Sequence, residues 1–265
     1  MSSSLLDHPL ISSRYFFPRG ASLDRAFFVT AADGVSRLAC YRASPYDGAP
    51  TLLHFHGDGE VVGDYMPEMV SIFSSLGVNV LFAEYRGYGA STGSPTLGAI
   101  LDDAETIFAA LGEPPHNIVL FGRSLGSLCA IELASRHPDI RGLILDSGIA
   151  DAFERILLRV SPEELGVSEV ELESAVARRL DHRSKLTRYP GPLLVLHALH
   201  DTLVDCSLAE RNGSWSGARP EDKELVLFSR GSHNTIFFEN RERYITSLRL
   251  FLDRIVRARP LPSYA

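Results

Sequence analysis

Cysteine is scarce in this 265-residue chain, and long hydrophobic runs are absent from its sequence. Its three cysteines, Cys40, Cys129 and Cys206, have neither the number of a disulfide framework nor the spacing of a zinc site, so we expect reduced thiols. No apolar run approaches the ~18 residues that a membrane span needs. The first residues also lack the basic segment and apolar core of a secretory signal. These absences predict a cytoplasmic protein with no membrane span.

Positive charge is in deficit as well. The 26 Lys and Arg residues are outnumbered by 33 Asp and Glu, and the net charge of −7 gives no reason to expect a nucleic-acid partner. No internal repeat, low-complexity tract or second domain is evident, and α/β folds of this length are routinely one domain. We therefore expect a single domain over residues 1–265, with a frayed tail from Arg257 to Ala265. The oligomeric state is left open by the sequence.

From residue 51 onward, short apolar runs alternate with helical stripes. Such alternation is typical of a parallel sheet covered by helices on both faces. The predicted strands of this part are 51–55, 78–83, 118–121, 142–146, 192–197 and 224–228, and the first helical stripe is 62–76. Functional sites in such sheets lie at the carboxyl ends of the strands.

The first forty residues are predicted to be rich in strands. Residues 26–30 and 36–41 flank Asp33-Gly34, which is typical of a hairpin turn. Arg14 to Phe17 is a further short candidate strand, closed by Pro18. Together with the later strands, the hairpin predicts a mostly parallel sheet of eight strands.

Residues 148–190 interrupt the alternation. Two segments there, beginning at Ser161 and Ser168, resemble capping boxes, and apolar residues follow at helical spacing. We predict a small helical cap inserted after the sixth strand, where a lid would cover the site. The alternative is an ordinary crossover helix with a long loop. Phe153 and Leu157 are candidates for an apolar acyl-binding surface on this segment.

The stretch 118–128 carries the most specific chemical signal. An apolar run leads into Gly122-Arg-Ser-Leu-Gly126, and a helical pattern follows. A strand, a sharp turn with a serine at its tip and a helix together form a nucleophile elbow. The two glycines are needed because side chains there would collide with the neighbouring strand or helix. The sequence therefore predicts that Ser124 is a nucleophile held in strained backbone geometry.

A serine hydroxyl needs a base to remove its proton, and the base needs an acid to orient it. Behind an elbow of this kind the acid follows a later strand and the histidine follows the last strand. Asp201 lies in the loop after strand 192–197, and His233 lies just after strand 224–228. Both the order and the loop positions predict a Ser124, Asp201 and His233 triad.

Other residues compete for these roles. Asp146 ends the sixth strand and could reach the same histidine, whereas Asp205 is expected to cap the next helix. Ser91, Ser127 and Ser147 lack a predicted strained turn, so we interpret them as local hydrogen-bonding residues.

A developing oxyanion needs donors that are already in place. The backbone N–H of Leu125, directly after the nucleophile, is one predicted donor. The loop His56-Gly57 allows the backbone to bend, which makes the N–H of Asp58 the second, with its carboxylate directed away. Gly59 is the alternative donor and a candidate substrate contact.

The chain has nine histidines, but their spacing matches no zinc motif. His54 and His56 share one face of a strand whose inner side needs core residues. We therefore expect neither a metal nor another cofactor.

With these residues in place, the chain resembles the α/β-hydrolase superfamily over nearly its whole length. Within it, Tyr85-Arg-Gly-Tyr-Gly-Ala-Ser-Thr-Gly-Ser-Pro95 and the His56-Gly-Asp58 loop resemble the BEM46-like group, which spans serine-aminopeptidase-like hydrolases and protein depalmitoylases. The resemblance implies the same triad and the same two oxyanion donors. Asp58 stands where relatives usually carry Asn or Gly.

The sequence thus predicts a serine hydrolase that acts on small acyl esters or thioesters through an acyl-enzyme. An aminopeptidase or amidase is the alternative, and it would need an anionic group, such as Glu60 or Glu84, to hold the substrate's ammonium. Those side chains are more often solvated. A lyase or a binding protein on the same fold is a further alternative, because one fold hosts many chemistries.

Overall fold

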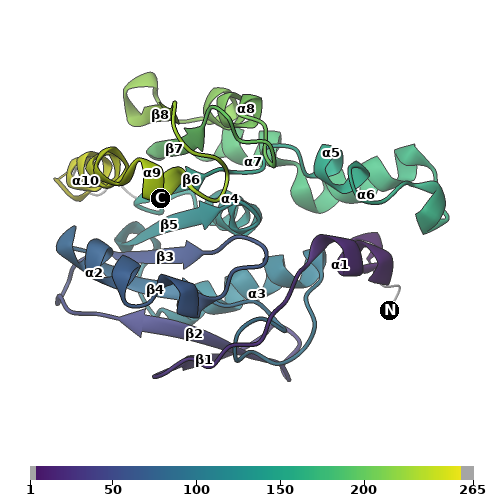
Figure 1. Ribbon diagram of the computed structural model, residues 1–265, viewed down its shortest axis with the longest axis horizontal. Helices are drawn as coiled ribbons and strands as arrows, with labels where there is room; N and C mark the ends of the chain where they lie inside the picture. The colour runs from purple at the N-terminus through teal and green to yellow at the C-terminus, as the bar shows by residue number, and fades with distance from the viewer. Residues whose placement is uncertain (1–3, 258–265) are drawn as a thin grey trace, which may run out of the picture.

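The computed structural model describes residues 4–257, which form one eight-stranded sheet with helices on both faces (Figure 1). The strand order is β1-β2-β4-β3-β5-β6-β7-β8. The strands are β1 (Phe27–Thr30), β2 (Arg37–Ala43), β3 (Thr51–Phe55), β4 (Asn79–Ala83), β5 (Ile118–Arg123), β6 (Gly142–Asp146), β7 (Leu193–Ala198) and β8 (Lys223–Phe228).

Six neighbouring strands, β3 to β8, run parallel, whereas β1 and β2 form an antiparallel hairpin at one edge. Strand β3 is buried along its whole length, and so are β4 and β6. Strands covered on both faces must be apolar throughout, which is why they appear in the sequence as short unbroken apolar runs. The prediction of a mostly parallel, eight-stranded α/β sheet is confirmed.

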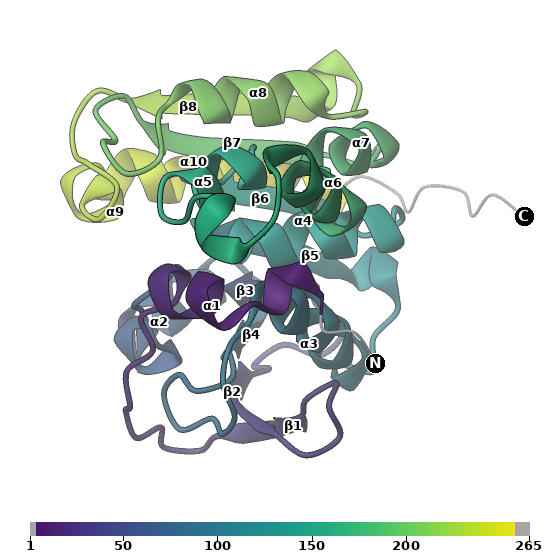
Figure 2. The same cartoon turned by 90° about the vertical axis from the view of Figure 1, so that its right-hand side faces the viewer.

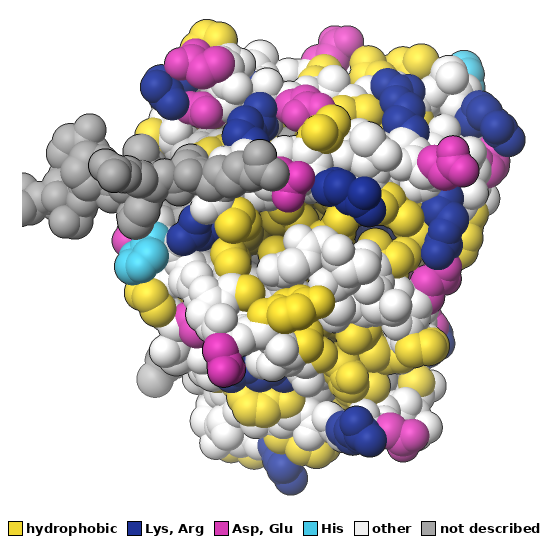
Figure 3. Space-filling model, turned by 90° about the vertical axis from the view of Figure 1, so that its left-hand side faces the viewer, with side chains coloured by type: hydrophobic (Ala, Val, Ile, Leu, Met, Phe, Trp, Pro, Cys, Tyr) yellow, Lys and Arg dark blue, Asp and Glu magenta, His cyan; other side chains and the backbone are white. Residues whose placement is uncertain are grey.

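Two hydrophobic cores lie on opposite faces of this sheet. One face is covered by α2 (Glu68–Ser75), α9 (Ile236–Glu239) and α10 (Arg241–Arg257). The other is covered by α3 (Leu97–Ala110), α4 (Gly126–Arg136), α7 (His182–Arg188) and α8 (Ser207–Trp215). Figure 3 shows the molecule from the side of α2 and α10, where hydrophobic side chains show between charged ones. No helix within residues 4–257 is both long and apolar enough to cross a bilayer.

Two sequence predictions about local structure are wrong. Residues 14–17 do not form a strand, because α1 (Pro9–Tyr15) ends there. Its first turn has Pro9 at a position that needs no N–H, and the His8 ring accepts a hydrogen bond from the Leu10 amide. The helix predicted from residue 62 instead begins as the short 3-10 helix η2 (Val62–Tyr65), and α2 starts only at Glu68.

The 148–190 segment contains α5 (Ala152–Leu157), the 3-10 turn η4 (Glu163–Leu165), α6 (Glu169–Leu180) and α7. Helix α6 begins with the predicted capping box, in which Ser168 and Glu171 exchange hydrogen bonds. Helices α5 and α6 contact each other and lie beside α1, as Figure 2 shows, whereas α7 packs against α4 and α8. Of the segment predicted as a cap, α7 therefore belongs to the layer that covers the sheet, and only α5 and α6 lie apart from that layer. The tail predicted beyond residue 257 lies outside the described residues.

His182, the first residue of α7, links this helix to the segment that follows β6 through a hydrogen bond. The His182 ring is buried, and its Nδ1 lies 2.9 Å from the Ile149 carbonyl oxygen. Burial lowers the pKa of His182 from 6.5 to about 4. The folded protein therefore holds this ring neutral, whereas the unfolded chain takes up a proton below pH 6.5.

Stability should consequently fall as the pH drops through this window, because the unfolded chain binds more protons there. The contribution of His182 amounts to about 3 kcal/mol. His182→Asn places an amide where Nδ1 lies but does not titrate. We expect the free energy of unfolding of the wild type, relative to this variant, to decrease by about 3 kcal/mol between pH 7 and pH 4 in urea titrations. A difference that does not change with pH would contradict this.

Candidate functional site

Ser124 occupies the sharp turn between β5 and α4. Its φ is +48°, in the left-handed region that costs a residue other than glycine about 1–3 kcal/mol. The Ser124 N–H donates to the Asp146 carbonyl oxygen at 2.9 Å, which ties the turn to the end of β6. This strained serine at the end of a central strand has the backbone geometry of a nucleophile elbow.

The two glycines of the elbow are required by close contacts. A Cβ on Gly126 would lie 2.1 Å from the Phe55 carbonyl oxygen, and a Cβ on Gly122 would lie 2.7 Å from the Gly126 carbonyl oxygen. Real Cβ atoms do not approach oxygen this closely. Helix α4 can therefore start directly against β3 and β5 only when these positions lack side chains.

Ser124, His233 and Asp201 form a continuous hydrogen-bonded row. His233 Nε2 lies 2.9 Å from Ser124 Oγ, and His233 Nδ1 lies 2.7 Å from Asp201 Oδ2. The serine comes from the end of β5, the aspartate from the loop after β7 and the histidine from the loop after β8. The structure thus brings together the three residues that the sequence predicts as a triad.

Asp201 is fixed on its other side by its own loop. Its Oδ1 accepts hydrogen bonds from the N–H groups of Leu203 and Val204, both at 2.8 Å. Burial opposes ionisation, but the hydrogen bonds from His233 and from these two amides outweigh it and hold the pKa of Asp201 below its ordinary value. His197 supports the same loop, with Nε2 2.8 Å from the Val204 carbonyl oxygen.

The competing residues have other contacts. Asp146 accepts from the Tyr244 hydroxyl at 2.7 Å and makes no hydrogen bond to His233. Asp205 accepts from the Ser207 amide at 2.9 Å, but the N-cap of α8 is Cys206, so the predicted cap role of Asp205 is wrong by one position. The sequence predicts that Ser147 lacks a strained turn, but its φ is also positive, at +51°. Ser147 is fully buried, however, so no substrate reaches it.

The two predicted oxyanion donors both border the cavity that holds Ser124. Within residues 4–257, neither the Leu125 N–H nor the Asp58 N–H is engaged in a hydrogen bond to the backbone of another element. The Asp58 carboxylate accepts from the Phe17 amide at 2.9 Å and from the Tyr88 hydroxyl. Burial raises the pKa of Asp58. The assignment of the two amides to an oxyanion stays a prediction.

The cavity around Ser124, here called the serine cavity, has a volume of about 230 Å³. The three tentative substrate contacts Gly59, Phe153 and Leu157 are not among its lining residues. Phe153 and Leu157 instead pack against the hydrophobic core, because the apolar stripe of α5 faces inward. Among the lining residues that the sequence did not predict are Tyr15, Phe17, Arg155 and Arg159.

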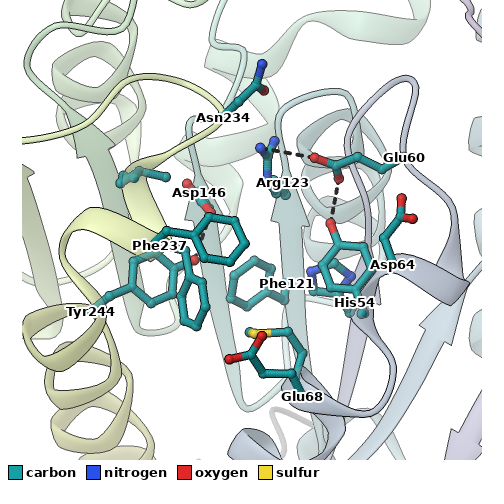
Figure 4. A pocket seen from close by; sticks show the side chains of 14 residues that line it. His54, Glu60, Asp64, Glu68, Phe121, Arg123, Asp146, Asn234, Phe237 and Tyr244 are labelled. Atoms are coloured by element: carbon teal, nitrogen blue, oxygen red, sulfur yellow. Dashed lines mark hydrogen bonds and ion pairs between the residues drawn. The ribbon is translucent and has the colours of Figure 1, made fainter.

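Arg123, inside the elbow itself, was also missed. One guanidinium nitrogen lies 3.0 Å from Glu60 Oε1 and donates to the His233 carbonyl oxygen at 3.2 Å. Glu60 in turn accepts from the Gly57 amide at 2.7 Å and from the Tyr65 hydroxyl. Figure 4 shows the ion pair between Arg123 and Glu60. The loops that carry His233 and Asp58 are thereby joined through one arginine.

A second cavity, the rear cavity, lies behind the elbow and has a volume of about 270 Å³. Figure 4 shows Phe121, Phe237 and Tyr244 around it, with Arg123 and Asn234 at one end. Arg123 and Asn234 line the serine cavity as well, so they lie between the two spaces.

Glu60 and Glu84 are not the solvated charges that the sequence suggests. Glu60 is paired with Arg123, and Glu84 is buried with its Oε1 2.6 Å from His56 Nε2. Within residues 4–257, no three His, Cys, Asp or Glu side chains gather as they would around a metal ion.

Residues 49–163 match the family described as serine aminopeptidase, S33. The chain is 27% identical to human alpha/beta hydrolase domain-containing protein 17B over 189 residues, which cover 68% of this chain and 60% of that protein. It is 38% identical to protein bem46 of Schizosaccharomyces pombe over 117 residues, or 42% of this chain and 39% of that protein. The match thus spans less than two thirds of either relative.

Solved structures resemble most of the chain. A Pyrococcus furiosus esterase, Pf2001, superposes with a TM-score of 0.67 at 20% identity, covering 87% of this chain and 91% of that one. A monoacylglycerol lipase from Paleococcus ferrophilus gives 0.62 at 21% identity, covering 82% and 99%. At these identities the likeness establishes the fold. The fold is that of an α/β hydrolase, and among the curated relatives the chain is similar to proteins of the BEM46-like group.

Proposed function

We propose that this chain is a serine hydrolase that cleaves acyl ester or thioester bonds. The observation that carries the proposal is the row Ser124, His233 and Asp201, with contacts of 2.9 and 2.7 Å, on a serine held at φ +48°. The match to the serine aminopeptidase family supports hydrolysis, and an esterase and a lipase occur among the similar structures.

In the proposed reaction, Ser124 Oγ attacks the acyl carbon while its proton passes to His233 Nε2. Asp201 stabilises the imidazolium that forms, because its carboxylate already accepts from Nδ1. The negative oxygen of the tetrahedral intermediate takes hydrogen bonds from the Leu125 and Asp58 amides. His233 then protonates the leaving group, and water repeats the cycle on the acyl-enzyme.

Cleavage of esters is favoured over aminopeptidase activity by the charges around Ser124. An aminopeptidase needs a carboxylate to hold the substrate's ammonium, but Glu60 and Glu84 are engaged by Arg123 and His56. Besides the triad, the serine cavity has one carboxylate, Asp58, and this is held by Phe17 and Tyr88. Aminoacyl anilides should therefore be poorer substrates than simple acyl esters of equal size.

Ser124→Ala should abolish activity, because no other serine within residues 4–257 forms a hydrogen bond with the His233 ring. We expect hydrolysis of 4-nitrophenyl butyrate to fall by at least about 10⁴-fold, and fluorophosphonate labelling to disappear. Ser91→Ala is the matched control, since Ser91 lies in a loop and accepts from the Ala39 amide. Labelling that persists in Ser124→Ala would disprove the assignment of the nucleophile.

Asp201→Asn should keep the fold and lose most of the rate. An amide in place of the carboxylate no longer stabilises the imidazolium and favours the wrong histidine tautomer, so kcat should drop by roughly 10³- to 10⁴-fold. Asp205→Asn, four residues further on and exposed, is the control and should retain kcat. Equal losses in both variants would argue against Asp201 as the acid.

Arg123 is expected to be a positioning residue, because it holds the His233 backbone and the Glu60 loop together. Arg123→Met should lower kcat roughly 10- to 100-fold, with a smaller change in KM. Arg123→Lys keeps a charge for Glu60 but cannot bridge both groups, so it should recover thermal stability more fully than kcat. If kcat and melting temperature recover in parallel, Arg123 has only a structural role.

A further inference from the structure

The serine cavity contains positive charge that no carboxylate neutralises. Arg155 and Arg159 line the cavity together with Ser124. Arg155 Nη1 donates to the Leu203 carbonyl oxygen at 2.6 Å, and Arg159 Nη1 donates to the Arg14 carbonyl oxygen at 2.8 Å. Within residues 4–257, neither guanidinium has an ion-pair partner among the Asp and Glu side chains.

Neighbouring arginines differ in this respect. Arg14 is paired with Glu164 at 2.7 Å, Arg211 with Glu154 at 3.1 Å and Arg123 with Glu60 at 3.0 Å. The carboxylates of Glu154 and Glu164 are thus taken by arginines outside the serine cavity, and Arg123, at the boundary of that cavity, is neutralised by Glu60. The charge on Arg155 and Arg159 is left facing the space in which a substrate must lie.

The spacing of these two residues adds to the effect. They are four positions apart on α5 and the turn that follows it, so their side chains emerge on one face. Like charges at this spacing repel each other. Arg155 Nε is also buried without a hydrogen-bond partner. An anionic group between the two guanidiniums would relieve the repulsion.

The carboxylate that shares the serine cavity with these two arginines does not cancel their charge. Asp58 is the one carboxylate of the serine cavity outside the triad, and it accepts from the Phe17 amide and the Tyr88 hydroxyl. Even with Asp58 ionised, two guanidiniums face one carboxylate. The Arg159 guanidinium instead lies over the Phe17 ring, 5.3 Å from its centroid.

We propose that Arg155 and Arg159 form an anion-binding subsite, and that the preferred substrates are acyl esters carrying a carboxylate or phosphate group close to the scissile bond. This inference rests on the proposed function for the step of hydrolysis, although the subsite itself binds without turnover. Charge-assisted hydrogen bonds from guanidinium groups give both affinity and orientation to such anions.

Two matched pairs of esters test the subsite. Mono-4-nitrophenyl adipate and its methyl ester differ by one charge on the acyl side, and 4-(butyryloxy)benzoate and its methyl ester differ by one charge on the leaving-group side. In at least one pair, kcat/KM should be about tenfold or more higher for the anion. The preference should weaken as the salt concentration rises, because salt screens the attraction.

The ratio of anionic to neutral kcat/KM is then measured in Arg155→Gln, in Arg159→Gln and in the double variant. We expect it to fall in each single variant and to approach one in the double variant. Arg211→Gln removes the same charge beside α5 but outside the serine cavity, so its ratio should match that of the wild type. Ratios near one in the wild type for both pairs, or a preference that survives in the double variant, would overturn the subsite.

Failure of the proposed function gives a different result. In that case none of the four esters is hydrolysed, and fluorophosphonate does not label Ser124. Calorimetric titration with the two benzoate-derived esters then decides the inference without turnover. Tighter binding of the anion, lost in the double variant, supports the subsite, whereas equal binding of anion and methyl ester rejects it.

Discussion

The left-handed backbone of Ser124 is the constraint on which the site depends. It persists because three strands restrain the turn. The end of β6 accepts the Ser124 amide, the end of β3 lies against Gly126, and β5 leads directly into the turn. Ser127 adds a further link, because its hydroxyl donates to the Ser124 carbonyl oxygen and accepts from the Ile149 amide. The local cost is thus offset by the packing of the sheet centre.

Around this turn, most ionisable groups that are buried or partly buried are matched in pairs. Asp201 faces His233, Glu84 faces His56 and Glu60 faces Arg123, each at 3.0 Å or less. Pairing is expected because an isolated charge is costly to remove from water. Arg155 and Arg159 depart from the rule at the one place where a ligand could supply the partner. The unpaired positive charge of Arg155 and Arg159 therefore distinguishes their side of the serine cavity from the rest of the site.

The sequence predicted the sheet and the relative order of Ser124, Asp201 and His233, because unbroken apolar strands and a glycine-flanked turn depend on local geometry. It failed where aromatic residues fit two structures equally well, as at residues 14–17, which end a helix. It also placed Phe153 and Leu157 in the site, although an apolar stripe favours the core over the solvent side. The bridge from Arg123 to Glu60 joins positions far apart in the chain, and no local pattern marks such a contact.

The boundary between the serine cavity and the rear cavity consists of the side chains of Arg123 and Asn234. Position 123 lies between Gly122 and the nucleophile, where the elbow requires no particular side chain. Main chain therefore determines where the reactive oxygen stands, whereas two side chains determine how much room lies behind it. A substitution at Asn234 would change the depth of the binding space while the triad stays in place, whereas one at Arg123 would also release the His233 loop.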